Sequence, residues 1–180
     1  MSQTMLARAA GLFYAINIAI GITALMWTRQ GYAGADLLTF LGALEYALVV
    51  VLLGCLFEPA GRAFSWAIAA IGLVSCALSA AAGPLHLLTL PFNVIAVFGP
   101  YCIGLGYLVV RSGMLPRAIG FLLVAAGISW LTFTWPALSH RVAPWNTAAG
   151  GIPELIFTLW LLLFGVRSTG PEFDSVSAPA

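Results

Sequence analysis

Hydrophobic positions in this chain gather into runs of about 20 residues, which short polar breaks separate. A helix needs about 20 mostly apolar residues to cross the hydrocarbon core of a bilayer, so every run is long enough to span. The pattern predicts six transmembrane helices, at 6–27, 36–57, 64–82, 85–110, 115–135 and 148–166.

The breaks between these runs are short and rich in Gly and Pro. Connections of this length force consecutive helices to be antiparallel neighbours. The predicted fold is therefore an all-α integral membrane bundle, with one six-helix transmembrane domain over 1–167. The remaining residues, 168–180, lack an apolar face and are expected to form a disordered tail.

Composition supports a membrane protein and limits its partners. The chain is 62% hydrophobic and 7% charged, whereas soluble domains are about 25% charged, so the lipid bilayer is its expected environment. A net charge of +1 without a basic patch argues against a nucleic-acid partner. The three cysteines and two histidines show no metal-ligand spacing, and no phosphate-binding glycine loop, GxSxG or HExxH motif occurs. We therefore expect no metal and no cofactor.

The arginines indicate the orientation of the bundle. If the amino terminus lies inside, the cytoplasmic ends of the spans carry five arginines and the opposite ends carry two. The positive-inside rule then places both termini in the cytoplasm. The five are Arg8, Arg62, Arg111, Arg117 and Arg167, and the two are Arg29 and Arg141.

Two of the six acidic residues, Glu45 and Glu154, lie within predicted spans. A charged side chain in hydrocarbon costs roughly 2.5–3.5 kcal/mol on insertion scales and is by default a candidate for function. Glu45 lies about 13 Å from the outer end of its span, near the midplane, and is the main catalytic candidate. Glu154 lies in the outer third and is a weaker one. The alternatives are a structural hydrogen bond for Glu45 and a charge that complements a helix start for Glu154.

Further polar residues in the spans lie at a similar depth and predict a pocket near Glu45. Tyr14 and Asn17 share one face of the first span, because residues three positions apart in a helix are neighbours. Asn93 and Tyr101 lie in the fourth span, and Thr158 lies one turn after Glu154. These residues are the candidate ligand-binding residues of a pocket that opens outward. The competing explanation is hydrogen bonding between helices without a ligand.

Several stretches of the chain carry a family resemblance. GYLVVRSGMLPRAIG, at 106–120, resembles the hallmark of a bacterial membrane family catalogued as domain of unknown function 4386. ARAAGLFYAINIAIG (7–21) and PELIFTLWLLLFGV (153–166) are similar to the first and last helices of that family. The resemblance covers nearly the whole chain. It implies a multi-pass protein of the bacterial cell (inner) membrane and brings no agreed activity.

The second predicted helix both matches and departs from the family pattern. The family tends to have an Asp some fourteen residues before a Pro, and Glu45 and Pro59 match that spacing. The loop before this helix is usually longer in the family than the break at 29–35. The family also often has a His roughly where Tyr101 stands. If that His served proton transfer, a phenol would be a poor substitute near neutral pH.

Three functions remain open at this point. The favoured one is a binding or transport protein whose pocket holds a small amphipathic or lipid-like molecule, with Glu45 as its polar anchor. The second is an intramembrane enzyme acting on an isoprenoid or lipid substrate, with Glu45 as general acid or base. The third is a structural or partner-binding membrane protein, with no protein partner assigned.

Overall fold

The computed structural model describes residues 2–167, and every regular element in that range is a helix. Six of these helices are long and apolar enough to cross a membrane, which confirms the predicted all-α bundle of a multi-pass membrane protein. The spans are α1 (Gln3–Gln30), α2 (Ala35–Phe57) with η1 (Glu58–Ala60), α3 (Arg62–Ala82), η2 (Val94–Val97) with α4 (Phe98–Ser112), α5 (Arg117–Leu131) with η3 (Thr132–Thr134), and α7 (Trp145–Leu163). The remaining helix of the described residues, α6 (Pro136–Val142), is short. The tail predicted at 168–180 lies outside the described residues.

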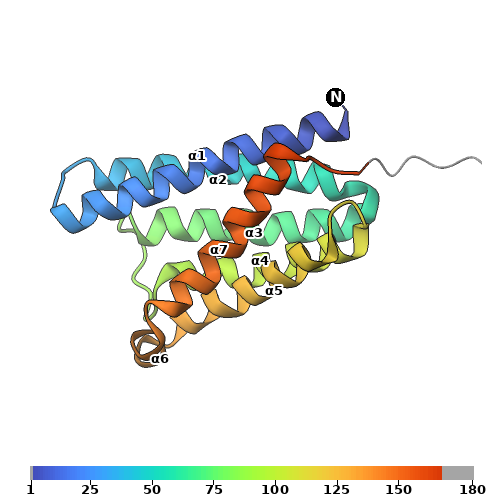
Figure 1. Ribbon diagram of the computed structural model, residues 1–180. Helices are drawn as coiled ribbons and strands as arrows, with labels where there is room; N and C mark the ends of the chain where they lie inside the picture. Colours follow the sequence, from blue (N-terminus) through green and yellow to red (C-terminus); the bar gives the residue numbers. More distant parts are fainter. Residues whose placement is uncertain (1, 168–180) are drawn as a thin grey trace, which may run out of the picture.

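The six spans form a closed ring. Each span packs on the next one along the chain, and α7 closes the ring because it packs on both α5 and α1. In Figure 1, α7 crosses the bundle obliquely, with its first half beside α5 and its last turns beside α1. Large apolar side chains such as Leu37, Leu44 and Phe121 face outward and suit a surrounding bilayer.

The two ends of the bundle differ. The α1–α2 turn, the loop at 83–93 and α6 lie at one end, which we call the α6 end, and residues 2 and 167 lie at the other (Figure 1). Trp27, Trp135 and Trp145 are exposed at the α6 end, as expected of anchors at a membrane interface.

The fourth span begins later than the predicted 85–110. Residues 85–93 form no helix, and helical structure resumes at Val94. Pro84 and Pro91 explain this difference, because proline lacks an amide hydrogen and disfavours helical geometry in the residue before it. Asn93, predicted inside the span, instead caps η2, where its side-chain oxygen accepts a hydrogen bond from the Ile95 amide at 3.0 Å.

The last span also differs from the predicted 148–166, since α7 runs from Trp145 to Leu163. The predicted connection before it contains α6, which begins at Pro136, a position where the missing amide hydrogen costs nothing. The earlier start places Glu154 nine residues after Trp145, about two and a half turns into the helix. The interpretation of Glu154 as a helix-start charge is therefore wrong, because the helix dipole acts mainly within the first turn.

Two pairs of glycines bring α4 and α5 into close contact. A Cβ atom on Gly106 would lie 2.5 Å from the carbonyl oxygen of Gly120, and one on Gly120 would lie 2.6 Å from that of Gly106. Gly99 and Gly127 repeat this arrangement seven residues away, at 2.9 and 2.5 Å. Small residues allow such close approach of helices in membranes, so these four glycines set the spacing of α4 and α5.

We predict that Gly106→Ala destabilises the protein by about 1–3 kcal/mol, because the added methyl group meets backbone that cannot move aside. The free energy of unfolding of the detergent-solubilised protein, measured by titration with a denaturing detergent, tests this. Gly151→Ala is the matched control, since a Cβ atom there meets nothing within 4 Å. Equal stability of the two variants would contradict the prediction.

Candidate functional site

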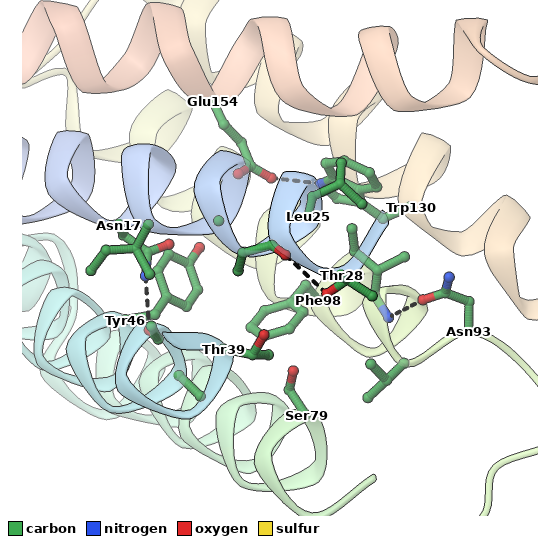
Figure 2. Close-up of a pocket in the computed structure, with 17 residues that line it drawn as sticks. Asn17, Leu25, Thr28, Thr39, Tyr46, Ser79, Asn93, Phe98, Trp130 and Glu154 are labelled. Atoms are coloured by element: carbon green, nitrogen blue, oxygen red, sulfur yellow. Dashed lines mark hydrogen bonds between the residues drawn. The ribbon is translucent and has the colours of Figure 1, made fainter. Parts of the chain in front are cut away.

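A cavity of about 560 Å³ lies among α1, α2, the end of α3, η2, α5 and α7, toward the α6 end (Figure 2). Most of its wall is formed by aliphatic residues, glycines and Phe98. Its polar lining residues are Asn17, Thr28, Thr39, Tyr46, Ser79, Asn93, Trp130 and Glu154. The cavity is thus an open pocket whose exposed surface is mostly apolar, with polar groups distributed along its wall.

Glu154 is the hydrogen-bond acceptor on which three other helices converge. The Tyr14 hydroxyl of α1 donates to its Oε2 at 3.0 Å. The Trp130 indole of α5 donates to Oε1 at 2.6 Å, and the Cys102 thiol of α4 donates to the same oxygen at 3.4 Å. Figure 2 shows the carboxylate directed toward the Trp130 indole.

Glycines shape the surroundings of this carboxylate. Gly150 lies one turn before Glu154, and a Cβ atom there would lie 2.5 Å from the Trp130 ring. The indole therefore packs flush against α7, with its N–H beside the carboxylate. On the other side, a Cβ atom on Gly11 would lie 2.8 Å from the backbone of Leu162, so α1 also approaches α7 closely. Both contacts depend on the missing side chain of a glycine.

The network continues from Glu154 to α2 through two tyrosines. The hydroxyl groups of Tyr14 and Tyr46 lie 3.0 Å apart and share a hydrogen bond. Their rings pack edge to face with centroids 5.3 Å apart, and Tyr46 packs in the same way on Phe98 at 5.4 Å. A polar chain therefore runs from α7 to α2 within an aromatic cluster.

Cations do not neutralise the carboxylates in the spans. In the part of the chain that the structure describes, the ion pairs are Arg62–Glu58 and His86–Asp36, and both lie at the surface near the ends of helices. Glu154 is instead satisfied by neutral donors. A carboxylate offers about four acceptor positions, so three donors leave one position free.

Glu45 has a different environment. Both of its carboxylate oxygens are buried and have no hydrogen-bond partner among residues 2–167. Asn17 lies beside it on α1, but its amide donates to the Gly42 carbonyl at 2.8 Å. Glu45 does not line the cavity, although its neighbour Tyr46 does, because successive helical residues point about 100° apart. The expected pocket is therefore built around Glu154 and not around Glu45.

The structure separates the five predicted ligand-binding residues into three groups. Asn17 and Asn93 line the cavity, and Tyr14 contacts the carboxylate that lines it. Tyr101 and Thr158 do not line it, and both are buried with hydroxyl groups that have no partner among residues 2–167. The sequence therefore predicted some of the residues around the cavity but placed its central carboxyl group on α2, whereas the carboxyl group that lines the cavity belongs to α7.

Three residues of the site escaped the sequence reasoning: Tyr46, Cys102 and Trp130. For Trp130 a signal exists in the sequence, because a tryptophan within a span needs an acceptor for its indole N–H. The carboxyl groups were the strongest acceptors available in the spans. A search for the acceptor of the Trp130 indole would therefore have indicated Glu154 as a candidate. The same reasoning applies to the Tyr46 hydroxyl, whereas Cys102 carries no comparable signal.

Part of this site lies in a segment that is similar to a described family. Residues 92–165 match the family model described as Domain of unknown function (DUF4386). The match confirms the family resemblance over that segment. It includes Cys102, Trp130 and Glu154, whereas Tyr14 and Tyr46 lie outside it. No curated protein and no solved structure matches the chain.

We predict that Trp130 and Glu154 are energetically coupled. In a double-mutant cycle of Trp130→Phe and Glu154→Gln, the coupling free energy should be on the order of 1 kcal/mol, because Trp130→Phe removes the donor of the hydrogen bond and Glu154→Gln replaces its carboxylate acceptor by a neutral amide oxygen. The free energies of unfolding of the four proteins give this quantity.

A second cycle, Trp130→Phe with Glu45→Gln, provides the control. The two effects should add, because no hydrogen bond joins these residues. Coupling of the same size in both cycles would contradict the prediction, because the coupling could then not come from the Trp130–Glu154 hydrogen bond.

Proposed function

We propose that this protein binds a small amphipathic molecule in the cavity beside Glu154. The observation that carries the proposal is the combination of a mostly apolar pocket with one half-buried carboxylate in its wall. Ligand sites in proteins are typically cavities of about 300–1,000 Å³, mostly apolar, with a few polar groups that orient the ligand. The volume of about 560 Å³ lies within that range.

The position of the cavity supports an occupant with distinct polar and apolar parts. Glu154 and Asn17 supply polar contacts, while residues such as Leu25 and Ile95 supply apolar wall. The apolar part of an amphipathic molecule would lie against these aliphatic side chains. Its polar part would reach the carboxylate.

Binding receives more support than catalysis. The Tyr14 hydroxyl and the Cys102 thiol contact the carboxylate, but both side chains are buried and neither lines the cavity. A substrate in the cavity would meet Glu154 and neutral hydroxyl groups such as that of Tyr46, and the lining residues that the structure describes include no histidine or lysine to activate them. Transport remains compatible with the proposal as a further step after binding.

We also propose that the protein resides in the bacterial cell (inner) membrane with both termini in the cytoplasm. The support is the family resemblance together with the arginines, of which five of seven lie away from the α6 end. On this orientation the cavity lies toward the outer leaflet.

The binding proposal predicts that the purified protein carries a bound small molecule that native mass spectrometry detects. Gly21→Leu should lower its occupancy at least about tenfold, a change of about 1.4 kcal/mol, because the new side chain enters the cavity from an open position. Gly151→Leu is the control, since Gly151 is equally open but does not line the cavity. Unchanged occupancy in Gly21→Leu would contradict the proposal.

The orientation proposal predicts the outcome of reporter fusions in a bacterial host. A fluorescent protein fused to the carboxyl terminus should fluoresce, because it folds in the cytoplasm, and alkaline phosphatase at the same place should be inactive. Alkaline phosphatase fused after Gly31, in the α1–α2 turn, should be active. The reverse pattern would show that the bundle has the opposite orientation, with the cavity toward the cytoplasmic leaflet.

A further inference from the structure

We propose that the occupant of the cavity is a lipophilic cation, whose positively charged head lies beside Glu154 and the aromatic rings around it. This inference rests on the proposed binding function and deepens it by naming the charge of the ligand. Three features of the cavity carry it: its charge, the free acceptor position on the carboxylate, and the aromatic side chains.

The charge of the cavity wall has one sign. Glu154 is the acidic residue of the lining, and among the described residues the lining contains no Arg, Lys or His. The two arginines at the α6 end, Arg29 and Arg141, are exposed and do not line the cavity. A cationic ligand would therefore meet an opposite charge and no like charge in the cavity wall.

The hydrogen bonds of Glu154 leave room for such a ligand. Tyr14, Cys102 and Trp130 are neutral donors, so they orient the carboxylate without compensating its charge. They fill three of about four acceptor positions. A cation in the cavity could take the remaining position and also supply the missing positive charge, which no protein side chain provides here.

Aromatic side chains surround the same region. Tyr46, Phe98 and Trp130 all line the cavity, and the first two pack edge to face at 5.4 Å. Aromatic faces attract ammonium and related cations, most strongly where water is excluded. In Figure 2, Tyr46 and Phe98 lie side by side, and Trp130 and Glu154 lie above them.

The same features disfavour an anionic ligand. Phosphate and carboxylate groups are held in proteins by Arg, Lys or clustered backbone amides, and the lining has none of these cationic side chains. An anionic head would also face the Glu154 carboxylate directly. The cavity should therefore discriminate between molecules of equal shape and opposite charge.

Tetraphenylphosphonium and tetraphenylborate provide this comparison, because they share shape and size and differ in charge. We would measure equilibrium binding of both probes to the full-length protein in nanodiscs of zwitterionic lipid. Binding to the cavity is taken as the part of the total binding that is lost in Gly21→Leu. This difference excludes probe that has partitioned into the lipid. The cation should bind at least about tenfold more tightly than the anion, a difference of about 1.4 kcal/mol.

Variants of the two carboxylates in the spans test the origin of this preference. Glu154→Gln should remove the preference for the cation, while Glu154→Asp, which keeps the charge, should retain part of it. Glu45→Gln should leave it unchanged, because Glu45 does not line the cavity. If Glu154→Gln fails to fold, the comparison of the two probes on the unmodified protein still tests the preference for a cation.

The outcomes separate the two proposals. Equal binding of both probes, or tighter binding of the anion, with both blocked by Gly21→Leu, would overturn the cation preference and leave amphipathic binding in place. A cation preference that persists in Glu154→Gln would overturn the role of this carboxylate in it. The absence of any binding sensitive to Gly21→Leu would overturn both the binding function and the inference built on it.

Discussion

The half-buried carboxylate of Glu154 is the constraint on which the arrangement of the helices depends. In the hydrocarbon region, water cannot satisfy a carboxylate, so the protein must supply donors. Tyr14, Cys102 and Trp130 do so from three different helices. Because the three donors converge on one residue of α7, they limit how that helix can cross α1, α4 and α5. The Tyr14–Tyr46 hydrogen bond extends this restriction to α2.

Glycines make this convergence possible. The Gly106–Gly120 and Gly99–Gly127 contacts bring α4 and α5 together, and these helices carry two of the three donors. Gly150 accommodates the Trp130 ring against α7. The segment that matches the family model holds the carboxylate and two donors, while the first helical hairpin supplies the tyrosines and much of the cavity wall. The site therefore forms only when both parts of the chain pack together.

Hydropathy predicted the number, order and antiparallel arrangement of the spans well, because a membrane allows few solutions for long apolar runs. It erred where helix formation depends on backbone geometry rather than on apolar character. Residues 85–93 are largely apolar, yet Pro84 and Pro91 keep them out of a helix. In contrast, the polar-looking break before the last span contains α6 and the first turn of α7.

The sequence alone determined that two carboxyl groups lie in apolar spans, and that each requires an explanation. Depth along each helix could be counted from the sequence, and it favoured Glu45. Only the tertiary structure decided that Glu154 lines the cavity and Glu45 does not. The reason is rotational: a helix turns about 100° per residue, and the direction in which a side chain points depends on which neighbours pack around it. The close contacts at Gly11, Gly106 and Gly150 set those neighbours, and they join residues far apart in the chain.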